Sequence, residues 1–253
     1  MDLGLSDRVY IVTGASRGLG RACAEQLAGE GARLVLCGRD EEAINVCSKD
    51  LGGSERAIAI PGDLTQAGIE TCLVAAAVAR FGRLDGALIN LGEPPPSAVM
   101  DADDGAWRLS FESAFVSPMR LARTVGRLSS NEGVSLLLVL SQSVREPVPG
   151  AALANGLRPG LAMVAKTLAD ELGPRSIRVN AILPGWIDAD RAAPGDGTAG
   201  REDNRRQLES RIPLGRFGEP LEFARPAVFL LSPASSYVTG TVLTVDGGVS
   251  RVL

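Results

Sequence analysis

The residues near the start of the chain that could do chemistry form a glycine-rich turn. The stretch YIVTGASRGLG, residues 10–20, leads an apolar segment into Gly14, Gly18 and Gly20. Glycines at these positions allow a tight turn and close approach of the backbone to a ligand, and a helix that follows offers its first N–H groups to a phosphate. In this strand–turn–helix context the spacing predicts a site for the pyrophosphate of a dinucleotide.

A second stretch with chemical potential is SQSVREPVPGAALANGLRPGLAMVAKTLADEL, residues 141–172. Ser141 and Ser143 can polarise a carbonyl, and Asn155 can orient a substrate or a water. Arg158 can stabilise a developing oxyanion, but it cannot act as an acid near neutral pH because its pKa exceeds about 12. Any catalysis here must therefore obtain its proton from another source.

The types of residue that are scarce restrict the chemistry further. The sequence has no histidine, two tyrosines (Tyr10 and Tyr237) and two lysines (Lys49 and Lys166). A His-based triad, a His general base and a His metal ligand are excluded, and the four scattered cysteines form no metal-type pairs. We expect no metal site.

These residues must be positioned by a doubly wound sheet. Short runs rich in β-branched and aliphatic residues alternate with helical patterns over the whole length, which predicts one α/β Rossmann-like domain, residues 1–253, with a parallel sheet covered on both faces. Seven strands are predicted, at 8–14, 33–38, 56–62, 86–92, 134–141, 177–185 and 241–248. The Gly-, Pro- and charge-rich segment 189–206 interrupts this rhythm, and its place after a strand favours a flexible substrate loop over a plain surface loop.

The overall charge and hydropathy exclude several partners. The net charge of −4 provides no electrostatic footprint for nucleic acid. No apolar run reaches the roughly 20 residues of a membrane span, and the N-terminus lacks a signal-peptide pattern. Scattered cysteines fit a reducing compartment, so we expect a cytoplasmic protein that binds a small molecule.

With these motifs in place, the chain resembles the short-chain dehydrogenase/reductase family over almost its whole length. TGASRGLG is similar to the family's cofactor motif, GDL (62–64) to the element that meets the adenine, INLG (89–92) to its Asn-Asn-Ala-Gly, and RVNAILPG (178–185) to the strand beside the nicotinamide. The resemblance implies a set of cofactor-binding residues: Gly14, Ser16, Arg17, Gly18, Leu19, Gly20, Arg39, Asp63, Leu64, Asn90, Gly92, Pro184 and Gly185.

The end of the second strand bears on the choice of cofactor. Gly38 stands where a carboxylate would select NAD(H), and Arg39 follows it; Arg17 can approach the same place. Arginine suits a 2′-phosphate, which favours NADP(H) over NAD(H). The alternative is that both arginines are solvated surface charges, and Asp40 lies nearby.

The resemblance also implies a catalytic Tyr, a Lys four residues later, a Ser and an Asn. A gapless register through the helix near 161–172 places Ala154 at the Tyr position, Arg158 at the Lys position and Ser141 at the Ser position, and Ala114 falls at the Asn position. Ala189 replaces a Thr that often contacts the nicotinamide. Neither tyrosine can be brought to the site by any shift, so the Tyr–Lys mechanism is excluded. We predict Ser141, Arg158 and Asn155 as catalytic residues.

Replacement acids are less well placed. Asp188 and Glu93 are the nearest carboxylates, although each is equally well explained as a solvated carboxylate of a loop. Lys166 lies two turns too far along its helix.

Two further segments resemble a divergent branch of the family that carries an N-x-x-R-x-G arrangement. They are NGLRPG (155–160) and EPPPS (93–97).

Three functions remain open at this stage. The first is an NADP(H)-dependent oxidoreductase with a rebuilt site; the second is a nucleotide-binding protein without turnover that acts as a sensor or partner subunit. A scaffold that binds nothing is disfavoured by the intact cofactor motifs. The resemblance also implies a homodimer or homotetramer that assembles through helices within 101–128 and 152–173 together with the C-terminal strand region.

Overall fold

A seven-stranded, all-parallel sheet forms the centre of the computed structural model, which describes residues 2–90, 92–128, 133–189 and 205–252. The strand order is β3-β2-β1-β4-β5-β6-β7. The strands are β1 (Val9–Thr13), β2 (Arg33–Gly38), β3 (Ala57–Pro61), β4 (Gly86–Asn90), β5 (Ser135–Val139), β6 (Arg178–Pro184) and β7 (Val242–Val245). All seven predicted strands are confirmed, although all except β2 are shorter than predicted.

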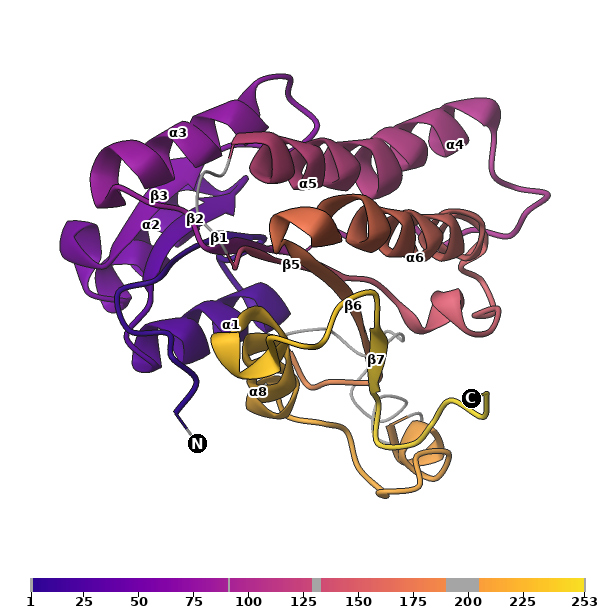
Figure 1. Ribbon diagram of the computed structural model, residues 1–253. Helices are drawn as coiled ribbons and strands as arrows, with labels where there is room; N and C mark the ends of the chain where they lie inside the picture. Colours follow the sequence, from indigo (N-terminus) through magenta and orange to yellow (C-terminus); the bar gives the residue numbers. More distant parts are fainter. Residues whose placement is uncertain (1, 91, 129–132, 190–204, 253) are drawn as a thin grey trace.

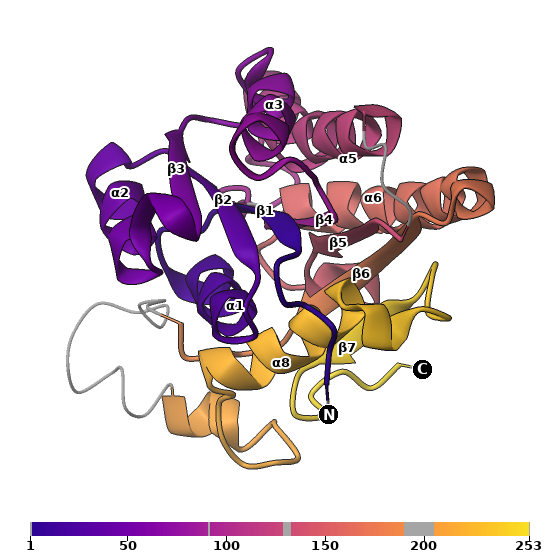
Figure 2. The same ribbon diagram turned by 60° about the vertical axis from the view of Figure 1, so that its left-hand side comes forward.

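Helices cover both faces of the sheet (Figures 1 and 2). One face carries α1 (Gly18–Gly29), α2 (Glu41–Asp50) and α8 (Pro220–Leu231), and the other carries α3 (Ile69–Phe81), α5 (Ser117–Leu128) and α6 (Ala152–Leu172). The helix α4 (Asp104–Phe111) runs into α5 through a π-helical segment, Glu112–Val116. No helix in these described ranges is long and apolar enough to cross a membrane.

The strands separate two apolar cores because successive side chains point to opposite faces. Val9 and Ile11 pack into the core under α3, α5 and α6, whereas Tyr10 and Val12 pack into the core under α1 and α8. Both faces of the central strands are thus buried, which explains their nearly continuous Val, Leu and Ile content.

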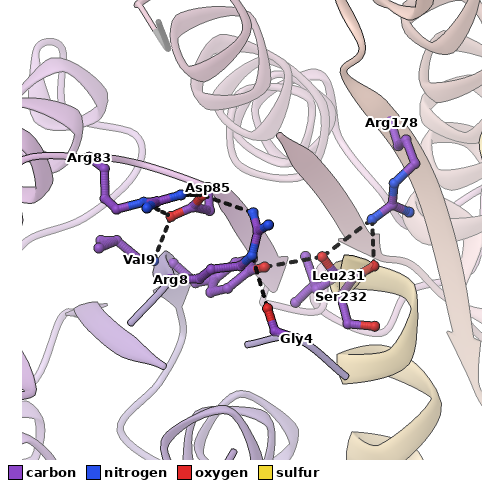
Figure 3. Close-up of polar contacts among 9 residues, drawn as sticks. Gly4, Arg8, Val9, Arg83, Asp85, Arg178, Leu231 and Ser232 are labelled. Carbon is purple, nitrogen blue, oxygen red and sulfur yellow. Dashed lines mark hydrogen bonds and ion pairs between the residues drawn. The ribbon is translucent and has the colours of Figure 1, made fainter. Parts of the chain in front are cut away.

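Two buried charged residues, Asp85 and Arg178, connect the amino ends of the strands to neighbouring segments (Figure 3). Asp85, which is 0% exposed, accepts hydrogen bonds from Arg8 Nη1 at 3.1 Å, Arg83 Nε at 2.7 Å and the N–H of Val9 at 2.9 Å. Arg178, at the start of β6, donates to the carbonyl oxygens of Leu230 and Ser232, both at 2.9 Å, and so satisfies groups at the end of α8. This network fixes the edge of the sheet away from the predicted site.

Tyr10 also takes part in this network at the amino ends of the strands. Its hydroxyl donates to the Leu231 carbonyl oxygen at 3.2 Å, and burial raises its pKa. The first of the two tyrosines is therefore a structural group.

The predicted substrate loop 189–206 falls mostly outside the described residues, since 190–204 are not described. Ala189 is half-buried, and Arg205 and Arg206 lie in a helical turn rather than in a loop. The prediction of a loop is therefore wrong for these last two residues.

Candidate functional site

The glycine turn lies between β1 and α1, where the carboxyl ends of β1 and β4 meet. Gly14 and Gly18 both have φ of +59°, a conformation that favours glycine. A Cβ on Gly20 would collide with the Gly14 carbonyl oxygen, so the third glycine is required by close packing of the helix on the turn. The structure thus explains the first two glycines of the motif by backbone conformation and the third by close packing.

The start of α1 has the features of an anion site. Arg17 precedes the helix, its side chain makes no capping hydrogen bond, and the first turn contains no acidic residue. The first N–H groups of a helix lack intrahelical partners and carry partial positive charge. The cradle formed by the turn and these N–H groups therefore fits a dinucleotide pyrophosphate, with Ser16, Gly18 and Leu19 around it.

Asn90 ties β4 to the glycine turn. The Asn90 N–H donates to Thr13 Oγ1 and the Thr13 hydroxyl donates to the Asn90 carbonyl oxygen, both at 2.9 Å. The Asn90 amide also reaches the Gly14 carbonyl oxygen at 3.5 Å. Thr13 was missed by the sequence prediction, and the only signal was its place immediately before the first glycine.

The residues at the end of β2 form one wall of the region where the adenosine of the cofactor is expected. Gly38 is buried, and a Cβ there would meet Ile44 Cδ1 at 3.3 Å, whereas Arg39 and Arg17 are exposed. Asp40 caps α2 by accepting a hydrogen bond from the Ala43 N–H at 3.0 Å. The carboxylate that complicated the choice of cofactor thus has a structural task.

A pocket of about 310 Å³ adjoins this wall and is lined by Ser16, Arg21, Asp40, Glu42, Ala43 and Val46. Its arginine is already paired, since Arg21 donates to Glu25 and Asp50 at 2.8 Å each. Arg17 and Arg39, which adjoin the lining residues Ser16 and Asp40 in the chain, are exposed and can supply a cation for a phosphate at this end.

Asp63 and Leu64 follow β3. The Asp63 carboxylate accepts hydrogen bonds from the N–H and the hydroxyl of Thr65, both at 2.9 Å, and Leu64 packs on the core. These contacts fix the turn that the sequence assigns to the adenine.

Ser143 lies in a short 3-10 helix, η3 (Gln142–Val144), at the carboxyl end of β5, and Ser141 is the residue immediately before this helix. Ser141 Oγ accepts a hydrogen bond from the Ser143 N–H at 3.3 Å, so Ser141 caps this turn. Ser143 is buried, and its hydroxyl donates to the Ala154 carbonyl oxygen at 3.4 Å. The serine turn is therefore held against the start of α6.

Ala154 and Arg158 lie one turn apart on a buried face of α6. Arg158 is only 1% exposed, and its Nη2 donates to the carbonyl oxygen of Gly92, beyond β4, at 2.9 Å. A permanent positive charge is therefore enclosed where the ends of β4 and β5 meet α6.

Asn155 is used by the backbone. Its Oδ1 accepts from the Val148 N–H and its Nδ2 donates to the Val148 carbonyl oxygen, both at 2.9 Å. This paired contact favours a structural role that anchors the segment before α6, and the catalytic role of Asn155 stays a prediction.

Pro184 and Gly185 are buried at the end of β6. The segment that follows returns towards the glycine turn, because a Cβ on Gly18 would lie 3.5 Å from the Ala189 carbonyl oxygen. The Asp188 carboxylate, which the sequence offers as a replacement acid, accepts a hydrogen bond from Arg205 Nη2 at 3.0 Å.

The two lysines and the second tyrosine lie elsewhere. Lys166 donates to the Gly240 carbonyl oxygen at 3.3 Å, Lys49 lies in the last turn of α2, and the side chain of Tyr237 is fully exposed. Burial raises the pKa of the Cys23 and Cys37 thiols to about 12. Ala114, the residue predicted at the Asn position, is buried in the π-helical segment.

The chain is similar to known proteins over almost its whole length. A family model described as Enoyl-(Acyl carrier protein) reductase matches residues 14–250. L-rhamnose 1-dehydrogenase (NAD(P)(+)) of Azotobacter vinelandii is 34% identical over 257 residues, which cover 97% of both chains.

Solved structures extend the similarity. A short chain oxidoreductase from Pseudomonas aeruginosa PAO1, described as containing an atypical catalytic center, is 30% identical with a TM-score of 0.87 and covers 99% of this chain and 100% of its own. Its NADPH-bound structure is 29% identical with a TM-score of 0.85, covering 99% of both chains. The L-sorbose reductase of Gluconobacter frateurii, complexed with NADPH and L-sorbose, is 29% identical with a TM-score of 0.90 over the whole of both chains. The chain belongs to the short-chain dehydrogenase/reductase family and is an oxidoreductase of that kind.

Proposed function

We propose that this protein is an NADP(H)-dependent carbonyl reductase or alcohol dehydrogenase whose site is built around Arg158 in place of the Tyr–Lys pair. The observation that carries the proposal is the buried guanidinium itself, which lies one helical turn after Ala154 and donates to Gly92. Burying a charge this deeply costs folding free energy unless other groups pair with it or hydrogen-bond to it. We also propose that the chain belongs to the divergent branch with the N-x-x-R-x-G arrangement.

The choice of NADP(H) is supported by the end of β2. Gly38 leaves no carboxylate for a free ribose, Asp40 caps α2, and Arg17 and Arg39 are exposed beside the pocket. Arginine makes charge-assisted bonds to phosphate. NADPH is bound in two of the similar structures, whereas the similar rhamnose dehydrogenase is named for both cofactors.

The chain's own residues then do most of the positioning. A bound nicotinamide supplies or accepts the hydride. Arg158 favours negative charge that develops on the substrate oxygen, and Ser141 donates a hydrogen bond to it. Since neither residue releases a proton near neutral pH, water delivers it, at a cost of roughly 10²–10⁴ in rate relative to a positioned acid.

A second candidate is a nucleotide-binding protein without turnover. It is favoured by the location of both tyrosines and both lysines, which lie away from η3 and the start of α6. Such a sensor or partner subunit would bind the cofactor with the same glycine turn.

The proposal also covers the oligomeric state of the protein and its cellular compartment. Leu109 on α4 and Met163 on α6 are 74% and 69% exposed, which favours their burial by a second copy in a homodimer or homotetramer. The cysteines are free, which suits the cytoplasm. The substrate is a small molecule, with no nucleic acid or membrane involved.

Fluorescence titration with NADPH and NADH, followed by absorbance loss with ketones, quinones and acyl thioesters, tests the proposal. Arg158→Met and Ser141→Ala should lose turnover, Arg158→Lys should keep part of it, and Arg225→Met on α8 is a matched surface control. Tight binding with no turnover on any acceptor supports the second candidate, and failure to bind either nucleotide contradicts both.

A further inference from the structure

Asn155 and Arg158 lie within one turn of α6, so their side chains leave the same face of the helix. Asn155 Oδ1 accepts a hydrogen bond from the Val148 N–H, and Asn155 Nδ2 donates to the Val148 carbonyl oxygen, both at 2.9 Å. Arg158 Nη2 donates to the Gly92 carbonyl oxygen at 2.9 Å. One turn of α6 therefore holds both the segment that follows β4 and the segment that follows η3.

The same two segments are also joined to each other. The Ser97 N–H donates to the Gly150 carbonyl oxygen at 2.8 Å, and the Ala152 N–H donates to the Ser97 carbonyl oxygen at 3.1 Å, as in a parallel bridge. These bonds join the β4 loop, residues 92–97, to the β5 loop, residues 145–151. Together with the two side chains of α6, they close a ring of hydrogen bonds that runs from α6 through both loops and back.

Prolines leave both loops few backbone donors, because proline has no N–H. Residues 94–96 are all proline, so the next N–H of the β4 loop belongs to Ser97. Residues 147 and 149 are also proline, so Val148 carries the one N–H between them. Both of these donors are used in the ring. Since proline also restricts the unfolded loops, a small number of hydrogen bonds suffices to order them.

We propose that Asn155 is a positioning residue, which holds the β5 loop so that the ring fixes Gly92 and with it the guanidinium of Arg158. An added Cβ on Gly92 would meet nothing within 4 Å, which leaves the hydrogen bonds of the ring to hold this residue. Arg158 is 1% exposed, and a group this enclosed serves a reaction only in the correct orientation.

The two polar residues of the N-x-x-R-x-G arrangement then have one loop each, Asn155 the β5 loop and Arg158 the β4 loop. The consequence for turnover rests on the proposed function, in which Arg158 acts on the substrate oxygen.

Hydrogen exchange of the full-length protein tests the ring without any turnover. Asn155→Ala removes both hydrogen bonds to Val148, and Ser97→Pro removes the N–H that reaches Gly150. The matched controls are Asn45→Ala, at an exposed position on α2, and Ser97→Ala, which keeps the backbone N–H.

Asn155→Ala should speed exchange of the Val148, Ser97 and Ala152 amides together, by about tenfold, the size expected from losing two neutral hydrogen bonds. Ser97→Pro should speed the Val148 and Ala152 amides by a similar factor. The double variant should be no faster than either single variant, because each change opens the same ring. Both controls should exchange like the wild type.

If Asn155 acts through Arg158, its effect on turnover depends on that residue. With NADPH, Asn155→Ala should lower kcat by about tenfold or more and leave the NADPH dissociation constant unchanged. In an Arg158→Lys background the same change should lower kcat by a smaller factor, since the guanidinium that the ring positions is gone.

Faster exchange at Val148 alone would overturn the proposal, because Asn155 would then anchor only its own contact. A loss of kcat with wild-type exchange would also overturn it and make Asn155 a catalytic residue, and so would equal losses of kcat in the two backgrounds.

Ser97→Pro opens the ring without changing α6, so it decides the exchange test if Asn155→Ala fails to fold. Absence of turnover in the wild type would contradict the proposed function, and the exchange results alone would then support or overturn the ring.

Discussion

The guanidinium of Arg158 and the carbonyl oxygen of Gly92 lie 2.9 Å apart and join the first half of α6 to the end of β4. The contact brings a permanent positive charge to the edge where the cofactor motifs converge. A Tyr–Lys pair both attracts the oxyanion and protonates it. Arg158 can perform only the first of these tasks, because an arginine cannot release a proton near neutral pH.

The rate of reduction should therefore depend on how strongly the anion formed from each acceptor needs a proton. Hydride addition to a quinone leaves an anion whose conjugate acid has a pKa of roughly 10, like a tyrosine, whereas an isolated ketone leaves a far more basic alkoxide that needs a proton at once. We expect quinones to be reduced at least about 10² times faster than isolated ketones, by analogy with the loss of a general acid. Comparable NADPH oxidation rates for both acceptor classes, corrected for the reaction without protein, would contradict this expectation.

Two glycines of α1 should respond to alanine in opposite ways. Gly20→Ala places a methyl group against the Gly14 carbonyl oxygen, so we expect a loss of roughly 1–3 kcal/mol in unfolding free energy and weaker NADPH binding. Gly29 ends the same helix with nothing within 4 Å of an added Cβ, and Gly29→Ala should gain about 0.5–1 kcal/mol. Urea unfolding of the two variants measures both changes, and equal effects would refute the role of close packing.

Arg39 should discriminate between the cofactors. Arg39→Ser removes an exposed cation at the end of β2, and we expect NADPH affinity to fall about tenfold, as for one charge-assisted contact, with NADH affinity unchanged. Fluorescence titrations with both nucleotides provide the comparison, with Arg225→Ser as the control. A parallel loss for NADH would show that Arg39 does not meet a 2′-phosphate.

Stability at acid pH should depend on Glu222. Its carboxylate accepts hydrogen bonds from Arg216 Nη1 at 2.7 Å and Nη2 at 2.6 Å and from the Glu219 N–H at 2.8 Å, and these partners lower its pKa to about 2. A carboxyl with a lowered folded-state pKa stabilises the protein above its unfolded pKa of roughly 4.3, and the contribution disappears as pH falls through about 2.

Thermal unfolding of the wild type and Glu222→Gln between pH 7 and pH 2 isolates this contribution. The wild type should have the higher Tm at pH 7, and the difference should close as the pH falls from roughly 4.3 to about 2. A difference that stays constant over that range would show that the charge of Glu222 is not what stabilises the start of α8.

Asp85 should matter for folding alone. Asp85→Asn removes the buried carboxylate that Arg8 and Arg83 share, and losing hydrogen bonds to a charged group costs about 1.5–3 kcal/mol. Asp7→Asn removes an exposed ion pair and should cost less than about 1 kcal/mol. Both folded variants should bind NADPH like the wild type, and weaker binding by Asp85→Asn would show coupling across the sheet.

The sequence was sufficient for features set by local pattern. Strand alternation and apolar runs predicted all seven strands, and the spacing of glycines predicted the turn at Gly14–Gly20. Contacts between distant segments were beyond reach. The paired hydrogen bonds of Asn155 with Val148 and the hydrogen bond from Arg145 to the Val242 carbonyl oxygen depend on how loops fold back, for which no periodicity exists.

The hydrogen-bond network at the amino ends of the strands has a consequence for how such a chain can evolve. Asp85, Arg178 and Tyr10 hold the fold without sharing a residue with the glycine turn or the serine turn. Substitutions that erase one chemistry at the opposite edge therefore leave the architecture viable. A protein of this design can pass through inactive intermediates while remaining folded, and arrive at a different reaction.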